Sequence, residues 1–243
     1  MAIKTSRGKS TRPPKRRPTA VAPSFDETWE TLYAHGTHLN RYPISQVVSF
    51  IFRHHPRKIP RAKVQILEIG SGAGNNLWFA AREGFSVTGI DASKSATEYA
   101  RKRFAEDNLT GRLDVGDFTK LPYADSTFDL AINRAAMTQT GLTNGRKAID
   151  ELHRTLKRGG LIYSEIYSDR TSAGGRPGLD GVTLDVEGLF AKVGQICFYS
   201  HRQVLELFSI GWEVMTLQHI DVAIMDHRPY DHLGQWNLVA RKL

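Results

Sequence analysis

The segment VQILEIGSGAGNN, residues 64–76, decides the fold. Its first half is an apolar β-type run, and its second half is a glycine-rich turn that opens a helix. Glycines at 70, 72 and 74 bare the backbone at the carboxyl edge of the strand, and Glu68 lies just ahead of them. Ligands bind at this edge in open α/β sheets, so the segment predicts a turn that holds a nucleoside-like ligand.

The glycine spacing narrows the ligand class. A dinucleotide fingerprint, G-x-G-x-x-G, counted from Gly70 would place its third glycine at position 75, which is Asn75. No lysine follows the turn, so a P-loop is excluded as well. A carboxylate beside bared backbone suits a ligand with cationic groups and no phosphate. The spacing therefore disfavours an NAD-dependent enzyme.

Two acids follow at the ends of later predicted strands. Residues 85–91 predict a strand that ends in Asp91, and a short strand at 112–115 leads to Asp117 and Phe118. An acid at the end of the second strand can accept hydrogen bonds from both hydroxyls of a ribose. Further elements are predicted as strands at 127–133, 161–167, 212–222 and 236–241 and as helices at 146–157 and 200–208.

Two motifs resemble those of the class I S-adenosylmethionine (SAM)-dependent methyltransferases. The turn E-x-G-x-G-x-G from Glu68 resembles their motif I, and ELHRTLKRGG at residues 151–160 resembles their E-x-x-R-x-L-K-x-G-G segment. The resemblance is close over residues 60–168 and looser over 200–243. It implies a SAM-dependent methyltransferase of the small-molecule type, with a doubly wound, seven-stranded, mainly parallel α/β sheet whose last strand is antiparallel.

The resemblance also implies a cofactor site. The acid after the third strand would accept from the adenine amino group, while the neighbouring side chain packs on the ring. Arg41 is either the partner of the SAM carboxylate or a surface arginine, and Asn75 and Asn76 either cap the helix or contact the methionine part. The residues expected to bind SAM are Tyr33, Arg41, Glu68, Gly70, Ser71, Gly72, Asn75, Asn76, Asp91, Ala92, Asp117, Phe118 and Asn133.

The chemistry of SAM demands little of the protein beyond alignment and exclusion of water, although a hydroxyl acceptor also needs a base. Glu165 and His201 are the candidate catalytic residues, with a half-buried structural role as the alternative for Glu165. The candidate acceptor-binding residues are Arg134, Tyr167 and His227.

The expected acceptor is a small or medium-sized molecule, such as a sugar or secondary metabolite with a hydroxyl or amine. The segment LNRYP at 39–43 is similar to that of bacterial methyltransferases of such pathways. Asn133 is followed by Arg134 and two alanines instead of Pro-Pro-Tyr, which disfavours methylation of a DNA base amine. Two other functions stay open: a nucleic-acid or protein methyltransferase tethered by a basic tail, and a non-catalytic SAM-fold subunit.

The positive charge of the chain is concentrated at its N-terminus. The net charge is +8, but seven of the 33 basic residues lie within residues 1–22, with no acid before Asp26. This segment is predicted to be a disordered tail, and the remainder is nearly neutral. A solvated tail, a tether to nucleic acid or an acidic surface, and a targeting signal all agree with the composition.

The rest of the chain divides into a helical cap at 23–60 and a SAM-binding domain at 61–243, in which residues 169–199 form a lid or substrate loop. A capping box at 24–27 predicts a helix over 25–36, and Pro43 begins a second helix.

No metal site is expected. Cys197 is the single cysteine, and His35 and His38 have no carboxylate nearby. The segment 226–232 is a polar loop by default, with a metal or acid–base role as the alternative. Without a membrane-length apolar run or a secretory signal, the sequence predicts a cytoplasmic protein, and it leaves the oligomeric state open.

Overall fold

The computed structural model describes residues 21–226 and 231–243. Most of the predicted basic tail, residues 1–20, and the candidate acceptor-binding residue His227 therefore lie outside the described residues. Ala22, which the sequence places in the tail, is buried, and its carbonyl accepts a 2.8 Å hydrogen bond from Asn144 Nδ2. The predicted boundary after residue 22 thus falls inside the packed chain.

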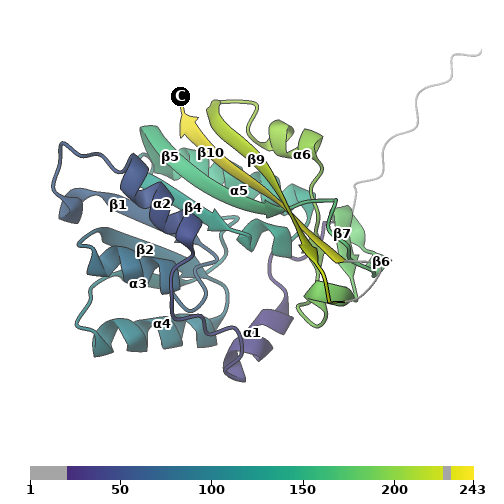
Figure 1. Ribbon diagram of the computed structural model, residues 1–243. Helices are drawn as coiled ribbons and strands as arrows, with labels where there is room; N and C mark the ends of the chain where they lie inside the picture. The colour runs from purple at the N-terminus through teal and green to yellow at the C-terminus, as the bar shows by residue number, and fades with distance from the viewer. Residues whose placement is uncertain (1–20, 227–230) are drawn as a thin grey trace, which may run out of the picture.

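A seven-stranded sheet in the order β3-β2-β1-β4-β5-β10-β9 forms the centre of the molecule (Figure 1). The five strands from β3 to β5 are parallel, and β10 is antiparallel to both of its neighbours. This confirms the doubly wound sheet predicted from the sequence. The strands are β1 (Gln65–Ile69), β2 (Ser86–Asp91), β3 (Arg112–Val115), β4 (Phe128–Arg134), β5 (Leu156–Tyr167), β9 (Trp212–Ile224) and β10 (Asp231–Lys242).

Helices cover both faces of the sheet, which is why the parallel strands are apolar on both sides. Ile66 of β1 packs with residues of α2, α3 and α4, whereas its neighbour Leu67 packs with residues of α5 and α6. None of the helices in the described part of the chain is long and apolar enough to span a membrane. The helices are α1 (Glu27–Ala34), α2 (Ser45–His54), α3 (Asn75–Arg82), α4 (Lys94–Glu106), α5 (Leu142–Thr155) and α6 (His201–Leu207), with 3₁₀ turns η1 (Arg61–Lys63), η2 (Ala136–Gln139), η3 (Leu179–Gly181) and η4 (Gly188–Phe190).

The two N-terminal helices begin later than predicted. Asp26 caps α1 by accepting from the Thr28 amide at 2.9 Å, so the expected capping role of Ser24 is wrong. The hydroxyl of Ser24 instead donates to Asp117, 93 residues away. The start of α2 falls at Ser45 instead of Pro43. At α1 a tertiary contact of Ser24 thus competes with the local signal for the start of the helix.

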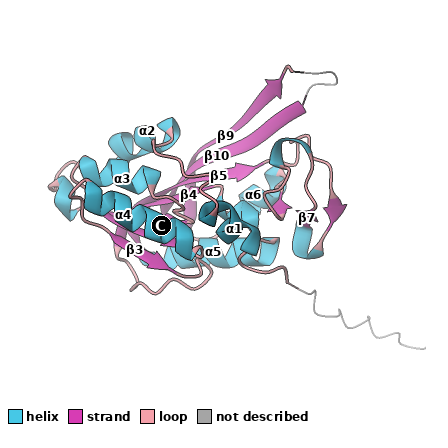
Figure 2. Ribbon diagram, turned by 90° about the horizontal axis from the view of Figure 1, so that it is seen from below, coloured by secondary structure: helices cyan, strands magenta, loops and turns pink. Residues whose placement is uncertain are grey.

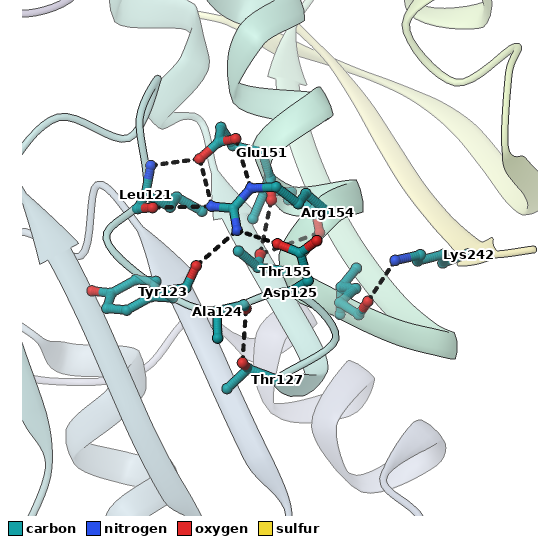
Figure 3. Close-up of polar contacts among 11 residues, drawn as sticks. Leu121, Tyr123, Ala124, Asp125, Thr127, Glu151, Arg154, Thr155 and Lys242 are labelled. Carbon is teal, nitrogen blue, oxygen red and sulfur yellow. Dashed lines mark hydrogen bonds and ion pairs between the residues drawn. The ribbon is translucent and has the colours of Figure 1, made fainter.

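The ELHRTLKRGG motif has a structural role (Figure 3). The guanidinium of Arg154 donates to the carbonyls of Leu121 and Tyr123, and it pairs with Asp125 at 2.7 Å and Glu151 at 2.8 Å. Glu151 also accepts from the Leu121 amide, and its hydrogen bond from Arg154 lowers its pKa. These contacts fasten α5 to the loop before β4 and leave the motif outside the pocket described below.

Residues 169–199 are more regular than predicted. They contain a three-stranded antiparallel sheet of β6 (Arg176–Pro177), β7 (Val182–Leu184) and β8 (Ile196–Cys197). Side chains of this insertion, including Val186 and Ile196, pack with Tyr167 at the end of β5. The hairpin of β9 and β10 extends outward from the sheet (Figure 2).

Candidate functional site

A cavity of about 330 Å³ lies at the carboxyl ends of β1, β2 and β4. Its wall includes the glycine turn, α1, the residues that follow β4, and Leu189, Phe190 and Val193 of the insertion. The strand order reverses between β1 and β4, so the pocket lies at the topological switch point of the sheet.

The glycine turn allows two segments to approach the backbone closely. Gly70 and Gly72 have φ values of +59° and +50°, in the left-handed region. A Cβ on Gly70 would lie 2.2 Å from the Ala136 Cβ, and a Cβ on Gly72 would lie 2.5 Å from the Tyr33 hydroxyl. The backbone conformation therefore favours glycine at both positions, and at Gly70 the contact with Ala136 also excludes a larger residue.

Asp91, at the end of β2, holds the turn in shape. Its Oδ2 accepts from the Gly72 amide and its Oδ1 accepts from the Ser93 amide, both at 2.8 Å. Burial raises the pKa of this carboxyl. Each carboxylate oxygen has a second acceptor site, so Asp91 can still accept from a ligand in the pocket.

Glu68 is a buried carboxyl group with one unused oxygen. Its Oε1 accepts from Asn76 Nδ2 at 2.7 Å, whereas its Oε2 has no hydrogen-bond partner among the described residues. Burial raises the pKa of Glu68 to about 8. An unpaired buried acceptor is destabilising by roughly 1–3 kcal/mol, so a cationic donor in the pocket would find a partner here.

Asn75 and Asn76 neither cap α3 nor point free into the pocket. The N-cap of α3, Gly74, has no side-chain hydrogen bond. Asn75 Nδ2 donates to the Tyr42 carbonyl at 2.8 Å, and Asn76 Oδ1 accepts from the Ile44 amide at 2.9 Å. The two amides thus bind the segment before α2 to the glycine turn, while both residues still line the pocket.

Beyond Asp91 the pocket is bounded by Phe118, which is buried. Asp117 is exposed and lies outside the pocket wall. Its Oδ2 accepts from the Ser24 hydroxyl at 2.6 Å, and its Oδ1 accepts from the Thr119 amide at 2.7 Å. Ser24 does line the pocket, so the N-terminal segment closes this end.

Helix α1 borders the pocket, and polar contacts attach it to the neighbouring segments. None of its eight described residues is buried. Hydrogen bonds that Ser93 and Ser95 donate to Glu30 lower the pKa of that carboxyl. The contacts that hold α1 and its cap are Asp26 Oδ2 with the Gln195 amide at 2.7 Å, Trp29 Nε1 with Gln139 Oε1 at 3.0 Å, and Glu30 with the hydroxyls of Ser93 and Ser95 at 2.6 and 2.5 Å.

The opposite end of the pocket is formed at β4 and β5. Arg134 lines the wall, and its Nη2 lies 3.4 Å from Glu165 Oε1 on the neighbouring strand. The Tyr167 ring lies beside Phe190 of the insertion, with 4.6 Å between the ring centroids. This end therefore combines one cation with aromatic side chains.

Known proteins resemble this chain in sequence and in fold. Residues 66–160 match the sequence pattern of the methyltransferase domain family. The chain is 27% identical to a sarcosine/dimethylglycine N-methyltransferase of Aphanothece halophytica over 68% of its own length and 58% of that enzyme. Residues 66–160 therefore form a methyltransferase domain. The family and the cofactor class predicted from the sequence are confirmed.

Two further methyltransferases illustrate the range of the likeness. A demethylmenaquinone methyltransferase of Clavibacter sepedonicus is 36% identical over 42% of this chain and 41% of its own length. A solved 1,6-didemethyltoxoflavin-N1-methyltransferase of Burkholderia thailandensis, with S-adenosylhomocysteine bound, superposes with a TM-score of 0.63 at 14% identity, over 87% of this chain and 84% of that one. The chain spans less than two thirds of the length of the curated relatives it matches.

The pocket suits SAM on the chemistry of its donors and acceptors. The unused Glu68 oxygen matches an ammonium group, and the second acceptor sites of the Asp91 carboxylate match hydroxyl donors of a ribose. The structure brings together at the pocket the predicted residues Tyr33, Glu68, Gly70, Ser71, Gly72, Asn75, Asn76, Asp91, Ala92, Phe118, Arg134 and Tyr167.

Four other predicted residues besides Asp117 lie away from the pocket wall. Arg41 is exposed. Asn133 is buried and donates to Ser164 at 2.8 Å, so its amide supports β4 instead of facing a ligand. Glu165 is buried beneath Arg134, and the His201 ring on α6 stacks on Trp236 at 5.2 Å. The catalytic roles proposed for Glu165 and His201 have no support in these positions.

Sequence reasoning missed several pocket residues. Trp29 lies one helical turn before Tyr33, a spacing that could have indicated a shared face. Gln139, Phe190 and Val193 carry no comparable signal, because irregular segments bring them to the pocket. The described residues contain no group of three His, Cys, Asp or Glu side chains that could bind a metal.

Proposed function

We propose that this chain transfers a methyl group from SAM to a small or medium-sized acceptor. Glu68 carries the proposal, because a buried carboxyl with one unpaired oxygen beside bared glycine backbone is suited to the ammonium of an amino-acid moiety. When bound, SAM supplies a methyl group already activated on a sulfonium.

The strand order supports an orientation for both substrates. The carboxyl ends along the sheet run from Phe118 after β3, through Asp91 after β2 and the glycine turn after β1, to Arg134 at the end of β4. Adenine, ribose and methionine parts would follow the first three positions. The acceptor would then lie at the ends of β4 and β5, beside Arg134 and Tyr167.

The protein's own contribution is to align the reactants and exclude water. Helix α1 and the insertion border the pocket from two sides, and Trp29 and Phe190 supply apolar surface there. Glu165 acts on Arg134 and not on the acceptor, because it lies beneath the guanidinium. The acceptors in the names of two of the similar methyltransferases, sarcosine/dimethylglycine and 1,6-didemethyltoxoflavin, are small organic molecules, which supports a small acceptor with a hydroxyl or amine.

Calorimetry with SAM and S-adenosylhomocysteine tests the cofactor assignment. The unaltered chain should bind both, and Glu68→Gln should bind at least about tenfold more weakly, because a charged hydrogen bond is worth roughly 1.5–3 kcal/mol. Glu83→Gln is the matched control, since Glu83 pairs with Arg61 on the surface. Failure of the unaltered chain to bind SAM would leave a non-catalytic subunit as the better interpretation.

The remaining alternative is a tail-tethered methyltransferase of nucleic acid or protein. Removal of residues 2–20 should leave turnover of a small acceptor and its salt dependence unchanged. A loss of activity on a polymer substrate would favour the tether. Incubation with methyl-labelled SAM and cell extract would then identify the acceptor. A cytoplasmic location remains part of this proposal and agrees with the single buried thiol of Cys197.

A further inference from the structure

The acceptor end of the pocket presents one cation within apolar surroundings. Arg134 lines this end together with Tyr167, Leu189, Phe190 and Val193. The rings of Tyr167 and Phe190 lie 4.6 Å apart at 51° and form one continuous apolar wall. Asp26 also lines the pocket, but its Oδ2 already accepts from the Gln195 backbone amide at 2.7 Å, and Glu165 lies beneath Arg134 and outside the wall.

Arg134 is held in place, but the protein does not occupy all of the N–H donors of its guanidinium. It pairs with Glu165 at 3.4 Å and makes a side-chain hydrogen bond with Tyr167, and its buried Nε has no hydrogen-bond partner among the described residues. The side chain keeps 35% of its surface exposed, whereas that of Glu165 keeps 3%. A guanidinium presents five N–H donors in a planar fork that matches two oxygens of an anion. Part of this donor set is therefore available to a ligand.

Glu165 is fixed from several directions, and it fixes Arg134 in turn. Its Oε1 accepts from Gln235 Nε2 at 3.2 Å, and its Oε2 accepts from the Tyr163 hydroxyl at 3.4 Å. Arg134 and Glu165 are also register partners on the parallel strands β4 and β5. A buried ion pair is often no more stabilising than an apolar replacement. Its position on the acceptor side of the pocket thus indicates a binding role for the guanidinium.

We infer, on the basis of the proposed methyl transfer, that the acceptor is an organic acid with a flat apolar body. Its acidic oxygen, as a carboxylate, phenolate or enolate, pairs with Arg134, and its body packs on Tyr167 and Phe190. A cationic amine would meet the like charge of Arg134. A sugar would find few polar partners for its hydroxyls in this wall. The inference therefore narrows the acceptors that the sequence suggested.

Binding of a matched pair of probes tests the inference on the full chain saturated with S-adenosylhomocysteine. Calorimetry should show 2-naphthoate binding at least about tenfold more tightly than its neutral isostere 2-naphthamide, as expected for a charge-assisted hydrogen bond. Arg134→Gln should abolish that preference while leaving the affinity for S-adenosylhomocysteine within about threefold. Arg134→Lys should retain part of the preference. Arg158→Gln, at the exposed start of β5, is the matched control.

Two outcomes would overturn the inference. One is equal affinity of the unaltered chain for acid and amide, or a preference that survives Arg134→Gln. The other is a loss of more than about tenfold in affinity for S-adenosylhomocysteine with the acid preference intact, which would assign Arg134 to the carboxylate of the cofactor. If Arg134→Gln does not fold, the double variant with Glu165→Gln removes both buried charges together and gives the same readout.

The cofactor measurement keeps the two proposals distinguishable. Absence of S-adenosylhomocysteine binding by the unaltered chain contradicts the proposed function. The preference for the acid probe is then measured in the absence of S-adenosylhomocysteine. Equal binding of the two probes would overturn the inference about the acceptor, whatever the outcome for the proposed function.

Discussion

At the cofactor end of the pocket the wall includes one short segment, the turn at 70–74, flanked by Glu68 and Asp91 near the ends of β1 and β2. At the acceptor end it consists of side chains from separate segments, including Trp29, Arg134 and the insertion. Backbone shape depends on glycine spacing, which is visible in a sequence. A wall of side chains depends on which segments meet in the fold, and that is not visible in a sequence. The two ends should therefore respond differently to substitution.

The largest expected effect is at the glycine turn. Gly70→Ala would place a Cβ 2.2 Å from that of Ala136 at a φ of +59°, so unfolding free energy should fall by roughly 2–4 kcal/mol and SAM binding should be lost. Gly159→Ala is the control for backbone strain alone. Gly159 also has a positive φ, +77°, but a Cβ there would have no atom within 4 Å.

Urea denaturation measures both variants. Gly159→Ala should lose only about 1 kcal/mol, and Ala136→Gly should restore part of the stability of Gly70→Ala. Equal losses in the two glycine variants would show that the close approach to Ala136 is unimportant.

The next effect concerns Glu68, whose pKa burial raises from 4.5 to about 8. A raised folded-state pKa contributes stability that is fully present below 4.5 and lost as the pH rises through 8. Glu68→Gln should therefore be the more stable protein at pH 8.5, by roughly 1–3 kcal/mol, while it binds SAM more weakly.

Two measurements check the Glu68 prediction. Thermal unfolding at pH 5 and pH 8.5 should show the variant's advantage only at the higher pH. Calorimetry in two buffers of different ionisation enthalpy should show proton release when the unaltered chain binds SAM at pH 7, and less release in Glu68→Gln. A stability difference independent of pH would contradict the buried, protonated state.

A smaller effect is expected at α1, which is attached by polar contacts. Glu30→Gln should lower the hydrogen-exchange protection of α1 by roughly 1 kcal/mol without changing that of β1. Hydrogen bonds from Ser93 and Ser95 lower the pKa of Glu30, so its contribution is lost as the pH falls through that lowered value. Glu27→Gln, an exposed residue of the same helix, is the control, and an equal loss there would indicate a general charge effect.

The smallest effects are expected where the sequence placed catalytic or cofactor roles outside the pocket. His201→Ala and Arg41→Ala should each change the free energy of SAM binding and the activation free energy of methyl transfer by less than about 0.5 kcal/mol. A loss of more than about tenfold in turnover for His201→Ala would restore its catalytic role and place the acceptor nearer α6.

Many residues at the cofactor end of the pocket could be predicted, because each of them lies within or beside the sequence motif that indicates it. Glu68, Gly70, Gly72 and Asp91 all follow directly from strand ends. Asn133 lies near the end of a strand too, but it is away from the pocket wall because its side chain turns to Ser164. The strand's end could be predicted, but the direction of that side chain could not.

The sequence by itself determined most of the strands and the turn that opens the pocket, and its resemblance to the methyltransferase family implied how the strands are arranged. Local spacing suffices for the strands and the turn, since they depend on backbone geometry and on burial of both faces. Only the tertiary structure decided which charges are buried, paired or left open. Glu165 lies beneath Arg134, Ser24 reaches Asp117, and the insertion brings Phe190 to Tyr167. Such contacts join residues far apart in the chain, and no local pattern specifies them.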